Sequence, residues 1–195
     1  MTLQRATTRP RLEGERAREV LDVTLELLSE VGYDKLTLDT VATRARASKA
    51  TLYRRWTSKA ELVADAMSGL EGAVDLPDTG SLRGDLLALV SSRRFEPSNA
   101  RLMCGVSTAM STDPELNSAL RQRFVQPRLA ALRRLLESGR ARGEVDDGVD
   151  LDLVASVMPA MMTFLSMISC EPPSPELAAR VVDEVVLPAV RPRNR

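Results

Sequence analysis

Basic and hydroxyl side chains gather in one short stretch of this 195-residue chain. From Arg44 to Lys59 there are six basic residues and no acidic one. Leu52 and Trp56 stand four residues apart, so they share one face of a helix, and that face is apolar. A helical wheel turns four side chains away from it, namely Ala50, Thr51, Tyr53 and Arg54. A small residue, a hydroxyl, a phenol and a guanidinium together can approach base edges while still donating to phosphates.

A second short helix pattern precedes this basic stretch. Leu38, Val41 and Ala42 repeat at helical spacing, and a four-residue break separates them from the basic helix. Both short helices therefore have an apolar face to bury. Two short helices joined by a tight turn, with the second one basic, predict a helix-turn-helix that reads DNA in the major groove.

Longer helices must hold these two in place. A helix expected over residues 13–31 carries an apolar face, and Gly32 is available to end it as a left-handed cap. Ser58 and Glu61 form a capping-box pattern that opens a further helix to about residue 70. We expect this helix to connect the reading helices to the rest of the chain.

Breaks in the helical pattern divide the chain. Pro77 and Asp78 lie in the clearest linker, between Gly72 and Gly80. The predicted parts are a flexible basic arm over 1–12, a helix-turn-helix domain with its connecting helix over 13–71, and a helical domain over 81–190.

Proline and capping signals in the last part bring the expected total to about nine helices, so the predicted fold class is all-α. Pro127 predicts a kink or a break in the pattern around it. The last two helices, at about 150–169 and 175–190, are the most apolar part of the chain. Such a surface needs a partner, and we expect a two-fold homodimer through these helices.

The order of several residues resembles a known family. The N-terminal domain of the tetracycline-repressor (TetR) family is similar in the succession Gly32-Tyr33, Thr37, Val41-Ala42, Ser48-Lys49, Thr51-Leu52-Tyr53 and Ser58-Lys59. This match covers roughly residues 13 to 70, whereas the remainder is similar only in length and helical pattern. The resemblance implies a three-helix DNA-binding domain followed by a helical domain for ligand binding and dimerisation.

The chain departs from the family pattern in the turn. Arg46 and Ala47 stand where a glycine and a valine are usual, and Ala50 replaces a common glycine. We therefore expect Arg46 to accept a φ above zero, which glycine takes without strain.

Ten residues are candidates for DNA contact. Thr37 and Ser48 are expected to cap the two short helices, whose amides then face phosphates. The family resemblance implies phosphate contacts for three residues, and the helical wheel turns three others toward the bases, with Arg54 as the guanine reader. The full set is Thr37, Arg44, Arg46, Ser48, Lys49, Ala50, Thr51, Tyr53, Arg54 and Lys59, in which Lys49, Tyr53 and Lys59 are the phosphate contacts and Ala50, Thr51 and Arg54 the base contacts. The alternative is that the arginines form an ordinary solvated face and that Thr37 and Ser48 are only caps.

Methionines are concentrated in the C-terminal half, and Met lines adaptable apolar pockets. The candidate ligand pocket uses some of Met103, Ser107, Met110, Phe124, Met162 and Phe164. Plain core packing is the alternative for each of them. Six aromatic residues and the absence of histidine favour an aliphatic or amphipathic ligand over a metal chelate.

Composition excludes other classes of protein. Without histidine, a nucleophile elbow, a phosphate loop or a close carboxylate pair, we expect no enzyme, no cofactor and no metal site. The two cysteines, Cys104 and Cys170, are too few for a disulfide framework. The uncharged stretch from Leu153 to Cys170 approaches the length of a membrane span, but it holds several hydroxyl residues and Pro159 and no basic anchor, so a buried helix is expected. No secretion signal is visible, which favours the cytoplasm.

These observations predict a dimeric transcription regulator that binds a near-palindromic DNA operator. A repressor released by a small, largely apolar ligand is the favoured interpretation. The alternative is a DNA-binding dimer with no small-molecule effector.

Overall fold

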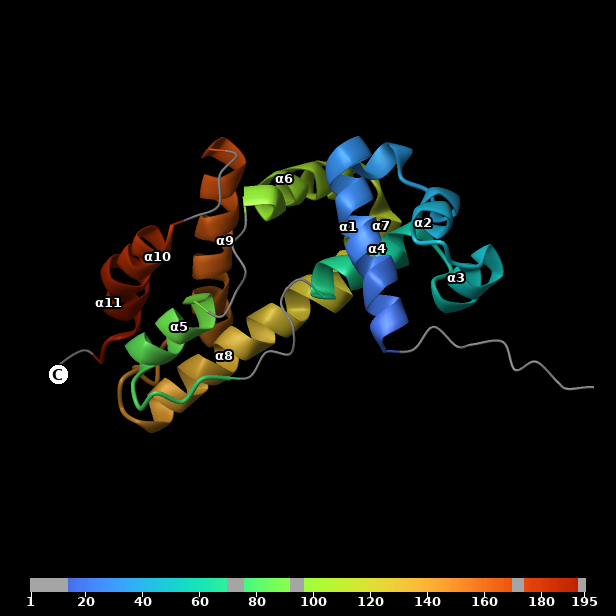
Figure 1. Cartoon of the computed structure of the whole chain (residues 1–195). Coiled ribbons are helices and arrows are strands. Elements are labelled where there is room, and N and C mark those ends of the chain that lie inside the picture. Colours follow the sequence, from blue (N-terminus) through green and yellow to red (C-terminus); the bar gives the residue numbers. More distant parts are fainter. Residues whose placement is uncertain (1–13, 70–75, 92–96, 170–173, 193–195) are drawn as a thin grey trace, which may run out of the picture.

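The computed structural model describes residues 14–69, 76–91, 97–169 and 174–192 (Figure 1). Within these ranges the chain forms nine helices, with α7, η1 and α8 counted as one and α10, η2 and α11 as another, and no strand, which confirms the all-α prediction. The elements are α1 (Glu15–Lys35), α2 (Leu38–Arg44), α3 (Lys49–Arg55), α4 (Lys59–Gly69), α5 (Leu82–Ser91), α6 (Pro97–Thr112), α7 (Pro114–Leu120), η1 (Arg121–Val125), α8 (Gln126–Ala141), α9 (Leu151–Ser169), α10 (Pro175–Val181), η2 (Val182–Val186) and α11 (Leu187–Val190). The expected arm over 1–12 and residues 72–75, the first part of the expected linker, lie outside the described residues.

Helix α1 is interrupted where the sequence places glycine. Gly32 has φ 76° and ψ 171°, a conformation that glycine adopts without strain. It differs from the left-handed helical cap that the sequence predicts, because ψ is extended. The chain then makes one short turn, in which Leu36 N–H donates to the carbonyl of Tyr33, and enters α2.

Two prolines are accommodated by wide π-helical turns instead of breaks. Pro127 and Pro188 each follow such a turn, η1 and η2. A proline inside a helix has no N–H to donate, and its ring collides with the carbonyl four residues earlier. In both places the residue before the proline donates five residues back, from Gln126 to the carbonyl of Arg121 and from Leu187 to that of Val182. The expected kink at Pro127 is therefore a local widening, and α7, η1 and α8 run on as one helix.

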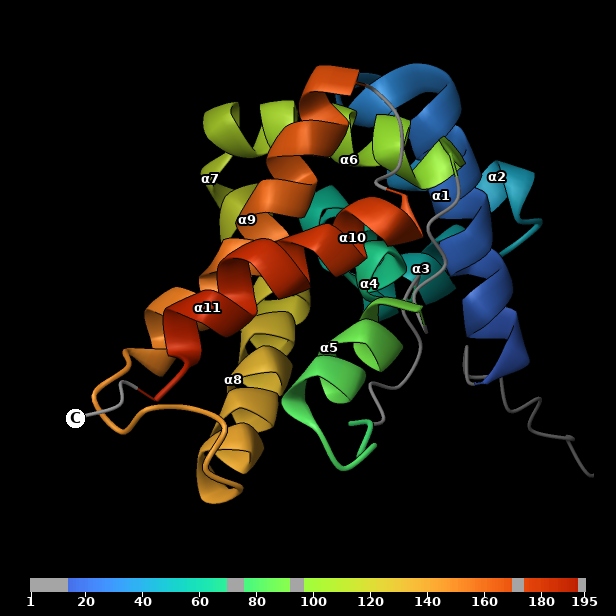
Figure 2. The same cartoon turned by 90° about the vertical axis from the view of Figure 1, so that its left-hand side faces the viewer.

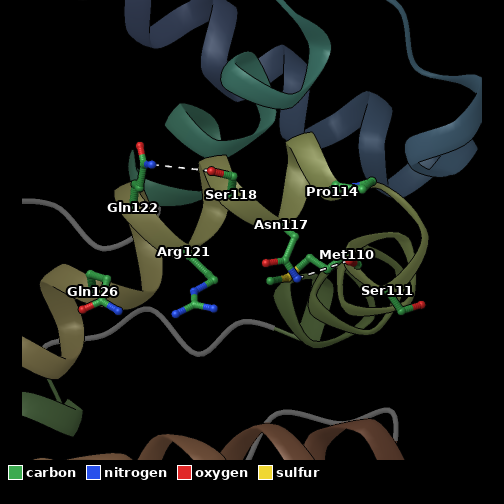
Figure 3. Close-up of a pocket in the computed structure, with 8 residues that line it drawn as sticks. All are labelled: Met110, Ser111, Pro114, Asn117, Ser118, Arg121, Gln122 and Gln126. Carbon is green, nitrogen blue, oxygen red and sulfur yellow. Dashed lines mark hydrogen bonds between the residues drawn. The ribbon is translucent and has the colours of Figure 1, made fainter.

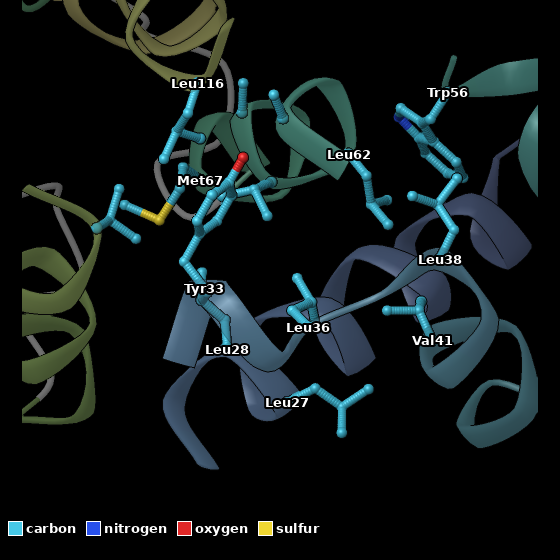
Figure 4. Close-up of a cluster of buried hydrophobic side chains, with 14 of the residues drawn as sticks. Leu27, Leu28, Tyr33, Leu36, Leu38, Val41, Trp56, Leu62, Met67 and Leu116 are labelled. Carbon is cyan, nitrogen blue, oxygen red and sulfur yellow. The ribbon is translucent and has the colours of Figure 1, made fainter. Parts of the chain in front are cut away.

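The first hydrophobic core packs α2 and α3, the two helices of the helix-turn-helix that are expected to read DNA (the reading helices), against the rest of the chain. Most of its members come from the segment from α1 to α4, and Trp56, Leu62 and Met67 are completely buried among them (Figure 4). Leu116 of α7 and Phe124 of η1 belong to the same core. Helices α1 and α4 thus pack against α6 and α7, which lie beyond the domain boundary that the sequence predicts. The predicted helix-turn-helix domain buries its apolar surface partly against the second half of the chain.

The second core joins α5, α8, α9 and the helix formed by α10, η2 and α11. Leu86, Leu136, Met158 and Val182 are among its buried members. In Figure 1 the two cores lie toward opposite ends of the molecule, with α2 and α3 at one end and α10 and α11 at the other. Figure 2 shows the helix formed by α10, η2 and α11 crossing in front of α9, which packs against α8.

A buried carboxylate lies in the first turn of α5, a helix of the second core. Asp85 of α5 is 1% exposed, and its Oδ1 accepts from the backbone N–H and the hydroxyl of Thr79 at 2.7 and 2.8 Å. Its Oδ2 accepts from Arg142 Nη2 at 2.8 Å. Burial alone would raise the pKa of Asp85, but the two bonds from Thr79 and the Arg142 guanidinium outweigh it and hold this pKa below the ordinary value.

Among the described residues, no helix is long and apolar enough to cross a membrane. The helix expected over the uncharged stretch that begins at Leu153 is α9, and its inner face packs in the second core.

Candidate DNA-binding surface

Helix α2 begins at a threonine that caps it, as the sequence predicts. Thr37 Oγ1 accepts from the backbone N–H of Thr40 at 3.1 Å. Thr40 Oγ1 in turn accepts from the backbone N–H of Thr37 at 3.1 Å. This reciprocal pair is a capping box with threonine in the place of the usual glutamate, and it fixes the direction in which α2 leaves α1.

The turn between α2 and α3 contains the expected backbone strain. Arg46 has φ 49°, which confirms the prediction made from its position in the family pattern. Arg16 of α1 stabilises the turn from outside, because its guanidinium donates to the carbonyls of Ala45 at 2.6 Å and Arg46 at 2.9 Å. Sequence reasoning missed Arg16, since nothing in a local pattern connects residues 29 or 30 positions apart.

Helix α3 presents the face that the helical wheel predicts. Leu52 and Trp56 are fully buried, whereas Ala50 and Arg54 are exposed and Tyr53 is 52% exposed. Thr51, on the flank, is half-buried. The exposed face therefore consists of short or hydrogen-bonding side chains, with Arg54 at its centre.

The expected cap of α3 is wrong in one respect. Ser48 stands at the N-cap position with extended backbone, but its hydroxyl makes no capping bond to α3. Its carbonyl instead accepts from the backbone N–H groups of Thr51 at 2.9 Å and Leu52 at 3.1 Å. The start of α3 is thus closed by the backbone, and the Ser48 side chain is exposed beside it.

An acidic residue of α2 faces the basic start of α3. Asp39 Oδ2 accepts from Lys49 Nζ at 2.7 Å, and its Oδ1 lies 3.4 Å from the Tyr53 hydroxyl that donates to it. The hydrogen bond from Lys49 and the charge of Asp39 raise the pKa of the Lys49 ammonium above its ordinary value. Two of the expected phosphate contacts therefore share one carboxylate.

Two other predicted contact residues are engaged elsewhere. Arg44 makes two hydrogen bonds to the Glu30 carboxylate of α1, at 3.0 and 3.2 Å, and this pairing raises the pKa of Arg44. Lys59 Nζ donates to the carbonyl of Tyr33 at 2.9 Å and lies 4.0 Å from the centre of its ring. Lys59 therefore also connects α4 to the end of α1.

Polar contacts connect the end of α3 to the second half of the chain. Trp56 Nε1 donates to Asp65 Oδ2 of α4 at 2.8 Å. Arg123 of η1 donates to the other oxygen of Asp65 at 2.5 Å and to Glu61 at 2.9 Å, and Glu61 accepts from the backbone N–H of Thr57 at 2.9 Å. A continuous chain of hydrogen bonds thus runs from η1 through α4 to the last residue of the reading helix.

The candidate pocket residues are not brought together. Phe124 is buried in the first core and Met162 in the second, while Phe164 is 61% exposed. Ser107 is half-buried on α6, and the side chain of Met103 lies outside the described residues. The six residues therefore do not all face one pocket, because the two phenylalanines and Met162 lie on different surfaces, and a pocket that uses some of the six stays a prediction.

A hollow of about 610 Å³ lies instead against α6, α7 and η1 (Figure 3). Of the predicted pocket residues only Met110 borders it, and the Asn117 side chain donates to the Met110 carbonyl at 3.3 Å. Its lining is polar apart from two side chains and consists of Met110, Ser111, Pro114, Asn117, Ser118, Arg121, Gln122 and Gln126.

Two family models match the chain. Residues 20–66 match the model described as bacterial regulatory proteins of the tetR family. Residues 76–185 match the tetracyclin repressor-like C-terminal domain.

Named relatives and solved structures agree with these matches. The chain is 41% identical to an uncharacterized HTH-type transcriptional regulator of Mycobacterium tuberculosis over 177 residues, which is 90% of this chain and 88% of the relative. It is 34% identical to a DNA-binding transcriptional repressor TetR of Mycobacteroides abscessus over 184 residues, 92% of this chain and 96% of that one. A crystal structure of a TetR family transcription regulator superimposes with a TM-score of 0.72 at 30% identity, covering 92% of this chain and all of the other. The chain belongs to the TetR family of helix-turn-helix transcriptional regulators.

Proposed function

We propose that this protein is a repressor that binds a near-palindromic operator as a homodimer, with one α3 helix in each of two successive major grooves. The exposed face of α3 is the observation that carries the proposal, because it combines a small residue with hydroxyl, phenol and guanidinium groups above a fully buried Leu52 and Trp56. Ala50, Thr51 and Arg54 are the proposed base contacts.

Phosphate contacts would surround this face. Lys49 and Tyr53 stand one helical turn apart on α3, both exposed, and can donate to the same stretch of backbone. Thr37 and Ser48 place the starts of α2 and α3 toward phosphates, and the Ser48 hydroxyl makes no cap bond that a phosphate would have to replace. Arg46 lies exposed in the turn between them. Arg44 and Lys59 are secondary candidates, because each has a partner within the chain.

Selection of genomic DNA fragments by the purified protein tests this proposal. A palindromic motif enriched by the natural protein and lost with Tyr53→Ala supports it. The selection is read at physiological salt, because phosphate contacts make DNA affinity strongly salt-dependent. Equal enrichment of a motif by both proteins would remove Tyr53 from the proposed contacts, and no enrichment by either would leave the helix-turn-helix without the proposed role.

An apolar stripe on α9 supports the homodimer. Leu153, Phe164 and Ile168 are 64%, 61% and 69% exposed, and their spacing keeps them on one face. The valines of the last helix contribute less than the sequence predicts, since Val182, Val186 and Val190 are buried in the second core. We therefore place the centre of the interface on α9, with Val185 and Pro188 at its edge, where both are exposed.

The proposed release mechanism uses η1. Arg121 and Gln122 line the hollow on one side of this wide turn, and Arg123, next in the chain, holds Asp65 and Glu61 on the other. A ligand that binds more tightly when η1 is displaced would weaken the hydrogen bonds between Arg123 and α4. It would thereby change the spacing of the two α3 helices in the dimer. One cation and several amides beside Met110 and Pro114 fit a small amphipathic molecule that carries a carboxylate.

A panel of aliphatic carboxylates added to the operator complex tests this mechanism. Release of the operator by some members, abolished by Arg121→Ala, supports it. If no member of the panel changes the DNA affinity, the regulator without a small-molecule effector is favoured.

A further inference from the structure

The two helices α2 and α3 carry one acidic residue, Asp39. Asp39 is the only acidic residue between Thr37 and Lys59, a stretch that holds six basic ones. An anion on a surface that approaches a polyanion works against binding, because long-range repulsion acts on DNA of every sequence. Its placement there therefore needs an explanation.

The contacts of Asp39 are with DNA-facing donors. Its two carboxylate oxygens accept hydrogen bonds from the Lys49 ammonium at 2.7 Å and the Tyr53 hydroxyl at 3.4 Å. Lys49 and Tyr53 lie one turn apart on α3, so the carboxylate bridges them from α2. A DNA phosphate at this position would, like the Asp39 carboxylate, be an oxyanion that accepts hydrogen bonds from an ammonium and a phenol.

We propose that Asp39 is an internal competitor for DNA phosphate, which occupies Lys49 and Tyr53 in the free protein and has to be displaced when DNA binds. The inference rests on the proposed phosphate contacts of Lys49 and Tyr53. Asp39 limits the affinity for DNA of any sequence, so that non-operator DNA is held weakly and base contacts decide where the protein stays.

Exposure makes this exchange feasible. The side chains of Lys49 and Asp39 are 60% and 49% exposed, and exposed ion pairs are worth little in free energy. A phosphate can therefore replace the carboxylate without the loss that breaking a buried pair would cause. In the free protein the hydrogen bond and the charge of Asp39 raise the pKa of the Lys49 ammonium.

The exchange also predicts a change in salt dependence. When Lys49 moves from Asp39 to a phosphate, cations leave the DNA but the freed carboxylate attracts cations again. Without the carboxylate, net cation release is larger. The negative slope of log affinity against log salt should then steepen by up to about one.

Asp39→Asn is the test variant, because the amide keeps the shape of the side chain and one acceptor oxygen while removing the charge. Asp22→Asn is the matched control, since Asp22 is an exposed acid on α1 of the same domain and its loss changes net charge equally. Binding of a labelled mixed-sequence duplex is followed by fluorescence anisotropy over a series of salt concentrations. Thermal melting of each variant verifies that it is folded.

The expected result is affinity about threefold or more higher for Asp39→Asn at low salt, with the steeper slope, and Asp22→Asn close to the natural protein. The gain should vanish when Asp39→Asn is combined with Lys49→Ala and Tyr53→Phe, because nothing is then left to compete for. Unchanged or weaker binding by Asp39→Asn, or a gain that persists in the combined variant, would overturn the inference. If Lys49→Ala alone leaves DNA binding intact, the proposed phosphate contacts fail, and that outcome is separate from a failure of Asp39→Asn.

Discussion

At the scale of single residues, two side chains of α3 are the proposed phosphate contacts, which would act on DNA of any sequence. Lys49 and Tyr53 are exposed one turn apart and face the same carboxylate in the free protein. Replacing both, as Lys49→Ala with Tyr53→Phe, should weaken binding to operator and to mixed-sequence DNA by similar factors. The slope of log affinity against log salt should become shallower by about one, because one cation is lost from the contact. Anisotropy titrations at several salt concentrations measure both quantities.

Arg134→Ala is the control for this double variant. Arg134 is exposed on α8, outside the reading helices, and its removal takes away the same charge. A comparable loss of affinity in the control would mean that net charge, and not the position on α3, determines binding.

Asp85 belongs to the same scale, with an effect on stability. Its pKa is held below the ordinary value of 3.8 by Thr79 and Arg142, against the opposing effect of burial. A depressed folded-state pKa contributes stability above the pKa of the unfolded chain, and this contribution disappears as pH falls through the folded value. Asp85→Asn should therefore lower the free energy of unfolding by about 2 to 4 kcal/mol at neutral pH, with a smaller difference below pH 3.8.

Chemical denaturation of the natural protein and Asp85→Asn at several pH values checks this. Asp147→Asn is the control, because Asp147 is fully exposed in a neighbouring turn. A difference between the natural protein and Asp85→Asn that does not shrink in acid would contradict the assignment.

At the scale of elements, η1 holds the reading helix through α4. Arg123 joins Asp65 and Glu61, and Asp65 in turn accepts from Trp56. Arg123→Ala should lower the free energy of unfolding by only about 1 to 2 kcal/mol, because these side chains are about one-third exposed and solvent screens their charges. Operator affinity should fall as well, since α3 loses part of its support.

Arg121→Ala is the matched control for that prediction, as it removes an arginine from the same turn that faces the hollow instead of α4. Denaturation and anisotropy separate the two variants. If both lower stability and affinity equally, the chain of hydrogen bonds through Arg123 has no special role.

The elements also show where prediction from sequence reaches its limit. The faces of α2 and α3 and the cap at Thr37 could be predicted from local spacing. The positive φ of Arg46 could be predicted from its position in the family pattern. Arg16, Asp65 and Arg123 could not, because their partners are close in space but far along the chain or on another helix. The sequence predicts a kink or a break at Pro127 and nothing at Pro188, whereas the structure has a π turn before each proline. Residue spacing does not distinguish a wide turn from a break.

At the scale of the whole molecule, the two cores explain why the six candidate pocket residues do not all lie together. The methionines and phenylalanines used for it are typical of pocket linings and of cores alike, and only packing distinguishes the two. Phe124 completes the first core beside the reading helices, while Met162 enters the second. Composition cannot assign a residue to one of two cores.

The exposed stripe of α9 gives the whole-molecule prediction. Phe164→Glu combined with Ile168→Glu places two charges on the proposed two-fold contact, where each would meet its own copy or lie buried. The natural protein should sediment as a dimer at micromolar concentration, and the double variant as a monomer with much weaker operator binding. Ser29→Glu, on the exposed face of α1, serves as the control and should stay dimeric. A natural protein that sediments as a monomer would remove the basis for a palindromic operator.

The central claim is that the exposed face of α3 reads base sequence. The most direct test is the affinity of the natural protein and of Arg54→Ala for the selected operator and for a set of its single-base variants. Arg54→Ala should lose about 1 to 3 kcal/mol on the operator and become indifferent to the base pair at one position in each half-site. An unchanged affinity, or an equal loss on operator and scrambled DNA with every base preference retained, would contradict the claim.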